Sequence, residues 1–192
     1  MFGEKNGRLF YLLDQLSELV ILGLVWLLCS LPVVTLGASC AALYQSIRVA
    51  IRGGEGNAIR VFFDTWKENL GKGLVVTILY GILFFMAGFF CLNAPNPYMA
   101  IPAGITAGLL LAAWMFFPPM LAGFSLNPFQ YFQASVFFAF RYIGKTLLLL
   151  VTLALCAVVF GIFPFLLPVL AGLYGYYSTI LLEPLLKEYA QV

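Results

Sequence analysis

Charged side chains and histidine are what this 192-residue sequence has least of. Only 9% of its residues are Asp, Glu, Lys or Arg, whereas 63% are hydrophobic. Soluble domains carry about 25% charged residues, so the composition excludes an ordinary water-soluble domain. The sequence contains no histidine at all. That absence removes the commonest general base and the commonest metal ligand.

Other signals of chemistry are also missing. The four cysteines are dispersed through apolar segments without a CxxC pair, as small core residues are. No P-loop or GxSxG motif occurs, and no acid or base lies centrally in an apolar run, where it would mark a functional site. We therefore expect no catalytic, cofactor-binding or metal-binding residues, and a protein that is not an enzyme.

Three long runs contain no charged residue. They cover 19–47, 73–140 and 146–182 and are 29, 68 and 37 residues long. Since one crossing of a bilayer needs about 20 mostly apolar residues, the sequence predicts an all-α fold. We expect a polytopic transmembrane helix bundle with five hydrophobic spans, forming a single membrane domain over 1–192 in contact with the lipid bilayer.

The first run can be read in two ways. Residues 1–18 suit an amphipathic N-terminal segment at the membrane surface, and 19–47 form a first span that contains Pro32, Thr35 and Gly37. Proline removes a helix hydrogen bond, and polar side chains nearby, such as Thr35, can satisfy the freed backbone groups. The run is either one kinked span or two helices that fold back at Pro32–Gly37, which would give six helices in all.

The remaining segments follow from polarity and turn signals. We expect a cytoplasmic loop at 48–72, with a short helix that lies on the membrane or continues into the next span, and loop character again at 124–145. Turns are expected at 94–97 and 164–168, which are rich in proline. Four further spans are expected, at 73–93, 99–123, 146–163 and 169–182, the second of them broken by Pro118 and Pro119.

The helix breaks are the first candidates for a site. A short motif recurs at Val61–Lys72 and Val136–Lys145, and each copy follows a proline-containing apolar segment. Corresponding breaks in two halves occur around the binding sites of repeat-built transporters, although chance similarity between apolar segments explains the motif equally well. The helix-break candidates are Pro32, Thr35, Gly37, Pro118 and Pro119.

Basic residues predict the orientation in the membrane. Five of the ten lie in 48–72, two in 124–145 and one near the C-terminus, whereas the turns at 94–97 and 164–168 have none. Lys and Arg accumulate on the cytoplasmic side, so the basic loops are expected there. Five crossings would leave Lys5 and Arg8 outside, whereas the folded-back alternative places all ten inside. The cytoplasmic-loop candidates for contacting a partner are Arg48, Arg52, Arg60, Asp64 and Lys67.

Uncharged polar residues within the spans could line a path for a neutral solute, or could simply bond along their own helices. They include Thr77, Asn93, Thr106, Thr152, Ser178 and Thr179. Tyrosine and tryptophan rings could stack on sugars, although anchoring at the membrane interface is their commoner role.

The segment Trp26–Ala38, with the sequence WLLCSLPVVTLGA, is similar to the YesL-like family, as are Ala41–Tyr44 and the later Val61–Asn69. That family consists of uncharacterised integral membrane proteins of mainly Gram-positive bacteria, so the resemblance implies a multi-pass plasma-membrane protein. Genes of this family often lie beside genes for carbohydrate uptake and degradation. The resemblance supplies no catalytic or binding residues.

Two functions are therefore expected as alternatives. The first is an accessory subunit or small permease in carbohydrate uptake, with components of a carbohydrate transporter as candidate partners. The second is a membrane-anchored interaction or regulatory protein that works through its basic cytoplasmic loop. The basic residues sit in short loops between apolar runs, so no nucleic-acid partner is expected. The sequence leaves the oligomeric state open.

Overall fold

The computed structural model describes residues 3–93 and 97–190, with side chains from 14 to 187 except 94–97 and 99. Within these ranges the chain is all-helical and has no strand. Five described segments are long and apolar enough to cross a membrane, as the charge-free runs predict. The described residues form seven α-helices: α1 (Gly3–Cys29), α2 (Leu36–Ser46), α3 (Ala58–Asn93), α4 (Pro97–Gly123), α5 (Pro128–Arg141), α6 (Ile143–Ile162) and α7 (Leu167–Ala190).

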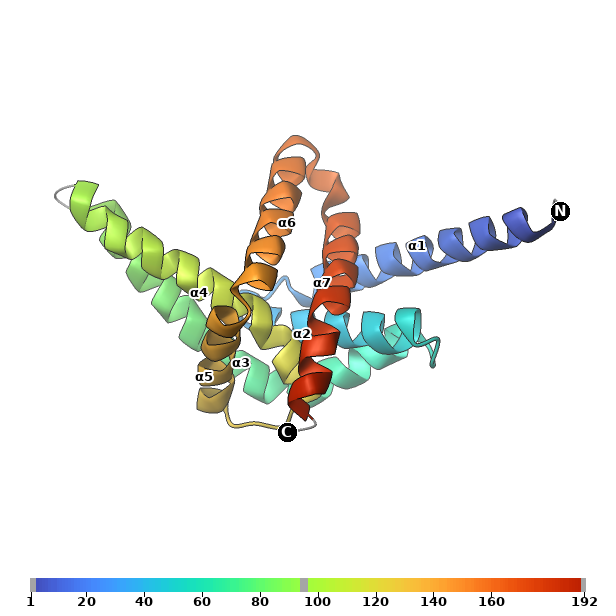
Figure 1. Ribbon diagram of the computed structural model, residues 1–192, viewed down its shortest axis with the longest axis horizontal. Coiled ribbons are helices and arrows are strands. Elements are labelled where there is room, and N and C mark those ends of the chain that lie inside the picture. The colour runs from blue at the N-terminus through green and yellow to red at the C-terminus, as the bar shows by residue number, and fades with distance from the viewer. Residues whose placement is uncertain (1–2, 94–96, 191–192) are drawn as a thin grey trace.

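The first apolar run folds back on itself. Helix α1 ends at Cys29, a 3₁₀ turn η1 covers Val33–Thr35, and α2 then runs back beside α1 (Figure 1). The Trp26 indole nitrogen lies 3.4 Å from Cys40 Sγ, whereas one continuous helix would place these residues about 21 Å apart. The folded-back alternative is therefore correct, and the single kinked span is wrong.

The segment expected as the loop 48–72 is mostly helical. A π-helical segment η2 (Ile47–Arg52) continues α2, a short turn contains Gly54 and Gly56 at positive φ, and α3 begins at Ala58. Helix α3 then continues without interruption to Asn93. Its buried residues Phe62, Thr65, Gly73, Val76 and Tyr80 recur at helical spacing across the expected boundary at 72, so one packed face stabilises it as one helix.

The expected break at Pro118 and Pro119 is absent. Helix α4 is continuous from Pro97 to Gly123 and contains both prolines. Both are buried, as are Phe116 and Phe117 before them. Proline fixes φ near the helical value, and packing around this buried turn stabilises the helical path despite the lost hydrogen bonds. Most of the expected turn at 94–97 lies outside the described residues.

The segment 124–145 also contains a helix that the polarity of the sequence did not predict. Helix α5 follows the turn after α4, and α6 begins directly after it at Ile143. At the start of α5 the backbone amide of Asn127 donates to the Gln130 side chain at 3.0 Å. The expected turn at 164–168 is present as the 3₁₀ turn η3 (Pro164–Leu166), which separates α6 from α7.

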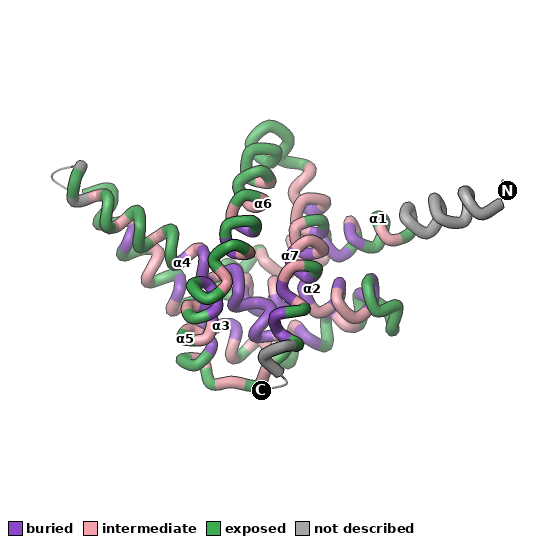
Figure 2. Tube along the Cα trace, viewed as in Figure 1, coloured by how far each residue is buried: buried purple, intermediate pink, exposed green. Residues whose placement is uncertain are grey.

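Helix α2 lies at the centre and contacts α1, α3, α4 and α7. Buried residues gather around it, while the outer ends of α3, α4 and α6 are largely exposed (Figure 2). On α6 the exposed residues are mostly Leu, Val and Phe. Because such surfaces are unfavourable in water, the exposed apolar sides of these helices are suited to contact with the hydrocarbon of a bilayer.

Candidate functional site

Side-chain hydroxyls satisfy the backbone where the chain folds back. The Thr35 hydroxyl lies 2.6 Å from the Cys29 carbonyl oxygen and 2.7 Å from that of Pro32. The Ser39 hydroxyl donates to the same Cys29 carbonyl at 3.1 Å. The Cys29 carbonyl has no helical partner because α1 ends there, and these side chains supply its donors, as the sequence predicts for Thr35.

Gly37 allows the start of α2 to pack closely against α3. Its backbone amide donates to Thr77 Oγ1 at 3.1 Å, and that hydroxyl donates to the Gly73 carbonyl at 2.6 Å. A Cβ atom on Gly73 would lie 3.0 Å from the Ala38 nitrogen. The two backbones therefore approach closely only because glycine occupies both positions.

A cavity of about 330 Å³ joins the two regions that the sequence marks as helix breaks. Leu36 lines it from the fold-back, and Pro118 and Pro119 line it from α4. Of the helix-break candidates, only Pro118 and Pro119 line the cavity, and Pro32, Thr35 and Gly37 do not. The fold-back reaches the cavity through Leu36 alone. Five aromatic side chains also line the cavity: Trp26, Tyr44, Trp114, Phe160 and Tyr174.

The chemistry of this cavity is apolar. Its walls are mostly Leu, Met, Pro, Phe and aromatic rings, and no Asp, Glu, Lys or Arg lines it. Two of its few polar groups are already bonded: the Trp26 indole to Cys40 Sγ, and the Ser178 hydroxyl to the Gly175 carbonyl at 2.8 Å. Tyr44 Oη is buried and has no hydrogen-bond partner among the described residues. The site can hold an apolar group.

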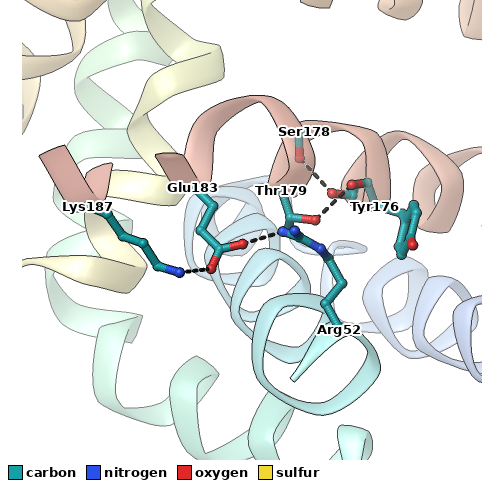
Figure 3. A network of polar contacts seen from close by, with 7 residues as sticks. Arg52, Tyr176, Ser178, Thr179, Glu183 and Lys187 are labelled. Carbon is teal, nitrogen blue, oxygen red and sulfur yellow. Dashed lines mark hydrogen bonds and ion pairs between the residues drawn. The ribbon is translucent and has the colours of Figure 1, made fainter. Parts of the chain in front are cut away.

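The cytoplasmic-loop candidates do not form one surface. Figure 3 shows the Arg52 guanidinium reaching the Glu183 carboxylate on α7, an ion pair within the protein. Lys187 Nζ lies 2.8 Å from the other carboxylate oxygen of Glu183. Arg48 is half-buried beside the C-terminal end of α4. These two arginines therefore pack against this chain.

The other three candidates lie on the first turns of α3 and are exposed. Arg60 Nε lies 3.9 Å from Asp64 Oδ2, with side chains that are 85% and 65% exposed, and Lys67 is exposed one turn further on. An exposed pair at this distance contributes little to stability. Arg60, Asp64 and Lys67 are consequently the members of the set that remain accessible to another molecule.

Among the residues that the structure describes, no group of three His, Cys, Asp or Glu side chains could hold a metal ion. Cys29, Cys40, Cys91 and Cys156 are free thiols.

Sequence reasoning considered the tryptophan and tyrosine rings as ligand contacts, but it missed Glu183 as an ion-pair partner and Tyr44 as a cavity residue. Glu183 could have been noticed as an acid four positions before Lys187, a spacing at which helical side chains pair. No local signal marks Tyr44, Trp114 and Tyr174 as neighbours. Their convergence follows from the packing of α2, α4 and α7, which lie far apart in the sequence.

No curated protein and no solved structure matches the chain. Residues 19–91 do match a protein family, described as "Protein of unknown function, DUF624". The matched segment includes the fold-back, α2 and nearly all of α3, and therefore the contact between Gly37 and Thr77. The chain is thus similar to the DUF624 family over residues 19–91, within a fold that has five candidate membrane spans among its described residues.

Proposed function

We propose that this protein is a non-enzymatic accessory subunit of carbohydrate uptake in the plasma membrane, and not itself the permease. We prefer an accessory subunit to a permease because the wall of the cavity between α2, α4, α6 and α7 is apolar. A sugar loses hydrogen bonds to water at every hydroxyl when it enters a membrane protein, and each uncompensated loss is costly. A wall of this composition cannot replace those bonds.

The uncharged polar residues of the spans support the same choice. Thr106, Thr152 and Thr179 each bond a carbonyl oxygen of their own helix, at 2.8, 2.7 and 2.7 Å. Asn93 bonds the Phe89 carbonyl at 2.9 Å in the same manner. These groups are engaged locally, so they are poor candidates for the lining of a sugar path.

The link to carbohydrate uptake comes from the resemblance of Trp26–Ala38 to the YesL-like family and from the genes that often lie beside members of that family. Its candidate partners are components of a carbohydrate transporter. The distribution of Lys and Arg favours a cytoplasmic position for the basic loops.

Deleting the gene and measuring uptake of labelled oligosaccharides tests the proposal. Loss of uptake of one class of sugar is expected, and the wild-type gene should restore it. A photocrosslinking residue at Lys67 should then capture a transporter component from intact membranes, identified by mass spectrometry. The same residue at Ile82, an exposed apolar position in the middle of α3, is the control for contacts within the bilayer. Unchanged uptake of every tested oligosaccharide would contradict the proposal.

The exposed cluster Arg60, Asp64 and Lys67 favours a second candidate, an interaction or regulatory protein that works at the cytoplasmic surface. Under that alternative the Lys67 probe captures one soluble or regulatory protein reproducibly, and sugar uptake is unaffected by the deletion. Reversing the charge of Arg60 and Lys67 to Glu should abolish that capture. Reversing Arg141, an exposed basic residue at the end of α5, should leave it intact.

A further inference from the structure

The apolar cavity is long and narrow. Its lining residues on α7 are Leu167, Leu170, Ala171, Tyr174, Gly175 and Ser178, which follow one face of the helix. The stretch from Leu167 to Ser178 covers about 16 Å along the helix axis. On α4, the residues from Leu111 to Pro119 line it at the same helical spacing over about 12 Å. A cavity of this shape fits a chain better than it fits a compact ring.

Its volume of about 330 Å³ also limits the occupant. An apolar cavity of about 150 Å³ already takes up a benzene molecule, so this one has room for a stretch of hydrocarbon about twice as large. A helix of a partner protein, with a diameter of about 10–12 Å, is too wide. Because the walls are apolar, water gains few hydrogen bonds there.

The cavity can be reached from the bilayer past α6. Ala157 and Phe160 of α6 both line the cavity, and both side chains are exposed. The outer part of α6 is apolar and lies at the edge of the fold (Figure 2). A hydrocarbon chain of the surrounding membrane can therefore enter from this side without crossing a polar surface.

One end of the cavity lies near positive charge. Tyr44 lines the cavity, and half-buried Arg48 lies one helical turn further along the chain, on the side where Arg52 pairs with Glu183. An occupant that carries negative charge at this end would lie close to Arg48.

From the shape, the volume, the opening at α6 and the positive charge of Arg48 near one end, we propose that the cavity binds one acyl chain of a membrane glycerophospholipid. The chain lies between α4, α6 and α7, and the phosphate of the lipid lies toward Arg48. This inference requires no partner protein and is independent of the proposed accessory role.

The tryptophan residues allow a direct test. Trp114 lines the cavity, whereas Trp66 lies outside it and donates to Ser39 Oγ at 3.2 Å. Bromine atoms on a lipid acyl chain quench tryptophan fluorescence on contact. Two single-tryptophan proteins, W26F/W66F and W26F/W114F, would be reconstituted with phosphatidylcholine that contains a rising fraction of dibrominated chains. Quenching of Trp114 should saturate at a low fraction of brominated lipid. Quenching of Trp66 should rise only in proportion to that fraction.

Blocking the cavity is the decisive step. Ala157→Phe places a ring in the opening, whereas Ala154→Phe places the same ring on an exposed position of α6 that does not line the cavity. Ala157→Phe should remove at least half of the saturable Trp114 quenching, and Ala154→Phe should leave it unchanged. If Ala157→Phe does not fold, Ala171→Leu narrows the cavity from α7 and should have the same effect.

Arg48→Gln tests the charged end. Loss of its positive charge should raise the half-saturating lipid fraction about 2- to 5-fold. Native mass spectrometry should find one phospholipid retained per wild-type protein and less on Ala157→Phe. Proportional quenching of Trp114 without saturation, or equal saturable quenching in the Ala157→Phe and Ala154→Phe proteins, would overturn the proposal.

Discussion

The backbone amide of Gly37 donates a hydrogen bond to the hydroxyl of Thr77, 40 residues further along the chain, at 3.1 Å. Through it the fold-back between α1 and α2 is fixed to the middle of α3. Thr77 is also bonded to its own helix through the Gly73 carbonyl. The Thr77 hydroxyl thus connects the Gly37 amide at the start of α2 to α3. That amide has no hydrogen-bond partner within its own helix.

Thr77→Val should destabilise the protein by about 1–3 kcal/mol, because the buried amide of Gly37 loses its acceptor while the side-chain shape is kept. Thr77→Ser restores the hydroxyl and should recover most of the loss. Unfolding in mixed micelles with increasing denaturing detergent, followed by tryptophan fluorescence, gives the comparison. Equal stability of the Val and Ser variants would show that the hydrogen bond contributes little.

A second close crossing joins α1 to α7. A Cβ atom on Gly172 would lie 2.6 Å from the carbonyl oxygen of Leu19, and one on Gly23 would overlap the Pro168 carbonyl. Gly172→Ala should therefore cost about 1–3 kcal/mol through overpacking. Gly81→Ala is the control. A Cβ there meets nothing within 4 Å, so it should be neutral or raise the melting temperature, since Ala favours helix over Gly. The same melting temperature for both variants would contradict the close crossing.

The ion pair between Arg52 and Glu183 links the end of η2 to α7, and its side chains are 30% and 16% exposed. A double-mutant cycle with Arg52→Gln and Glu183→Gln should give a coupling of about 1 kcal/mol, the upper end for partly exposed pairs. The coupling should shrink as salt is raised. Arg52→Gln alone should cost little, because Lys187 still pairs with Glu183. The matching cycle on Arg60 and Asp64, which are far more exposed, should give no measurable coupling.

The membrane spans could be predicted from the sequence. A charge-free run that is longer than the thickness of a bilayer has few alternatives to a transmembrane helix. The fold-back could only be offered as one of two readings. Pro32 marks a break, but the direction that the chain takes after it depends on Trp26 meeting Cys40 and on Gly37 meeting Thr77. Those contacts join separate segments, and no local pattern encodes them.

Pro118 and Pro119 show the opposite error. Proline is a strong local signal for a break, yet tertiary packing of a buried turn overrides it in α4. The cavity was beyond prediction for a related reason, since Tyr44, Trp114 and Tyr174 become neighbours only through packing. Helix α5 was missed although Asn127, Pro128 and Gln130 form a recognisable helix start.

The fold-back also predicts the side of the membrane on which each end lies. Helices α1 and α2 form a hairpin, so the start of α1 and the turn before α3 lie toward the same side of the fold (Figure 1). With Lys and Arg on the cytoplasmic side, an N-terminal epitope should be cytoplasmic.

In a protein with all four cysteines replaced by Ala, Glu55→Cys and Ser125→Cys should react with a membrane-impermeant maleimide only in inside-out vesicles. Tyr98→Cys, an exposed position at the start of α4, should react only in right-side-out vesicles. An N-terminal epitope on the same side as Tyr98 would contradict the hairpin. In that case α1 and α2 together would cross the membrane only once, an arrangement that the contact between Trp26 and Cys40 excludes.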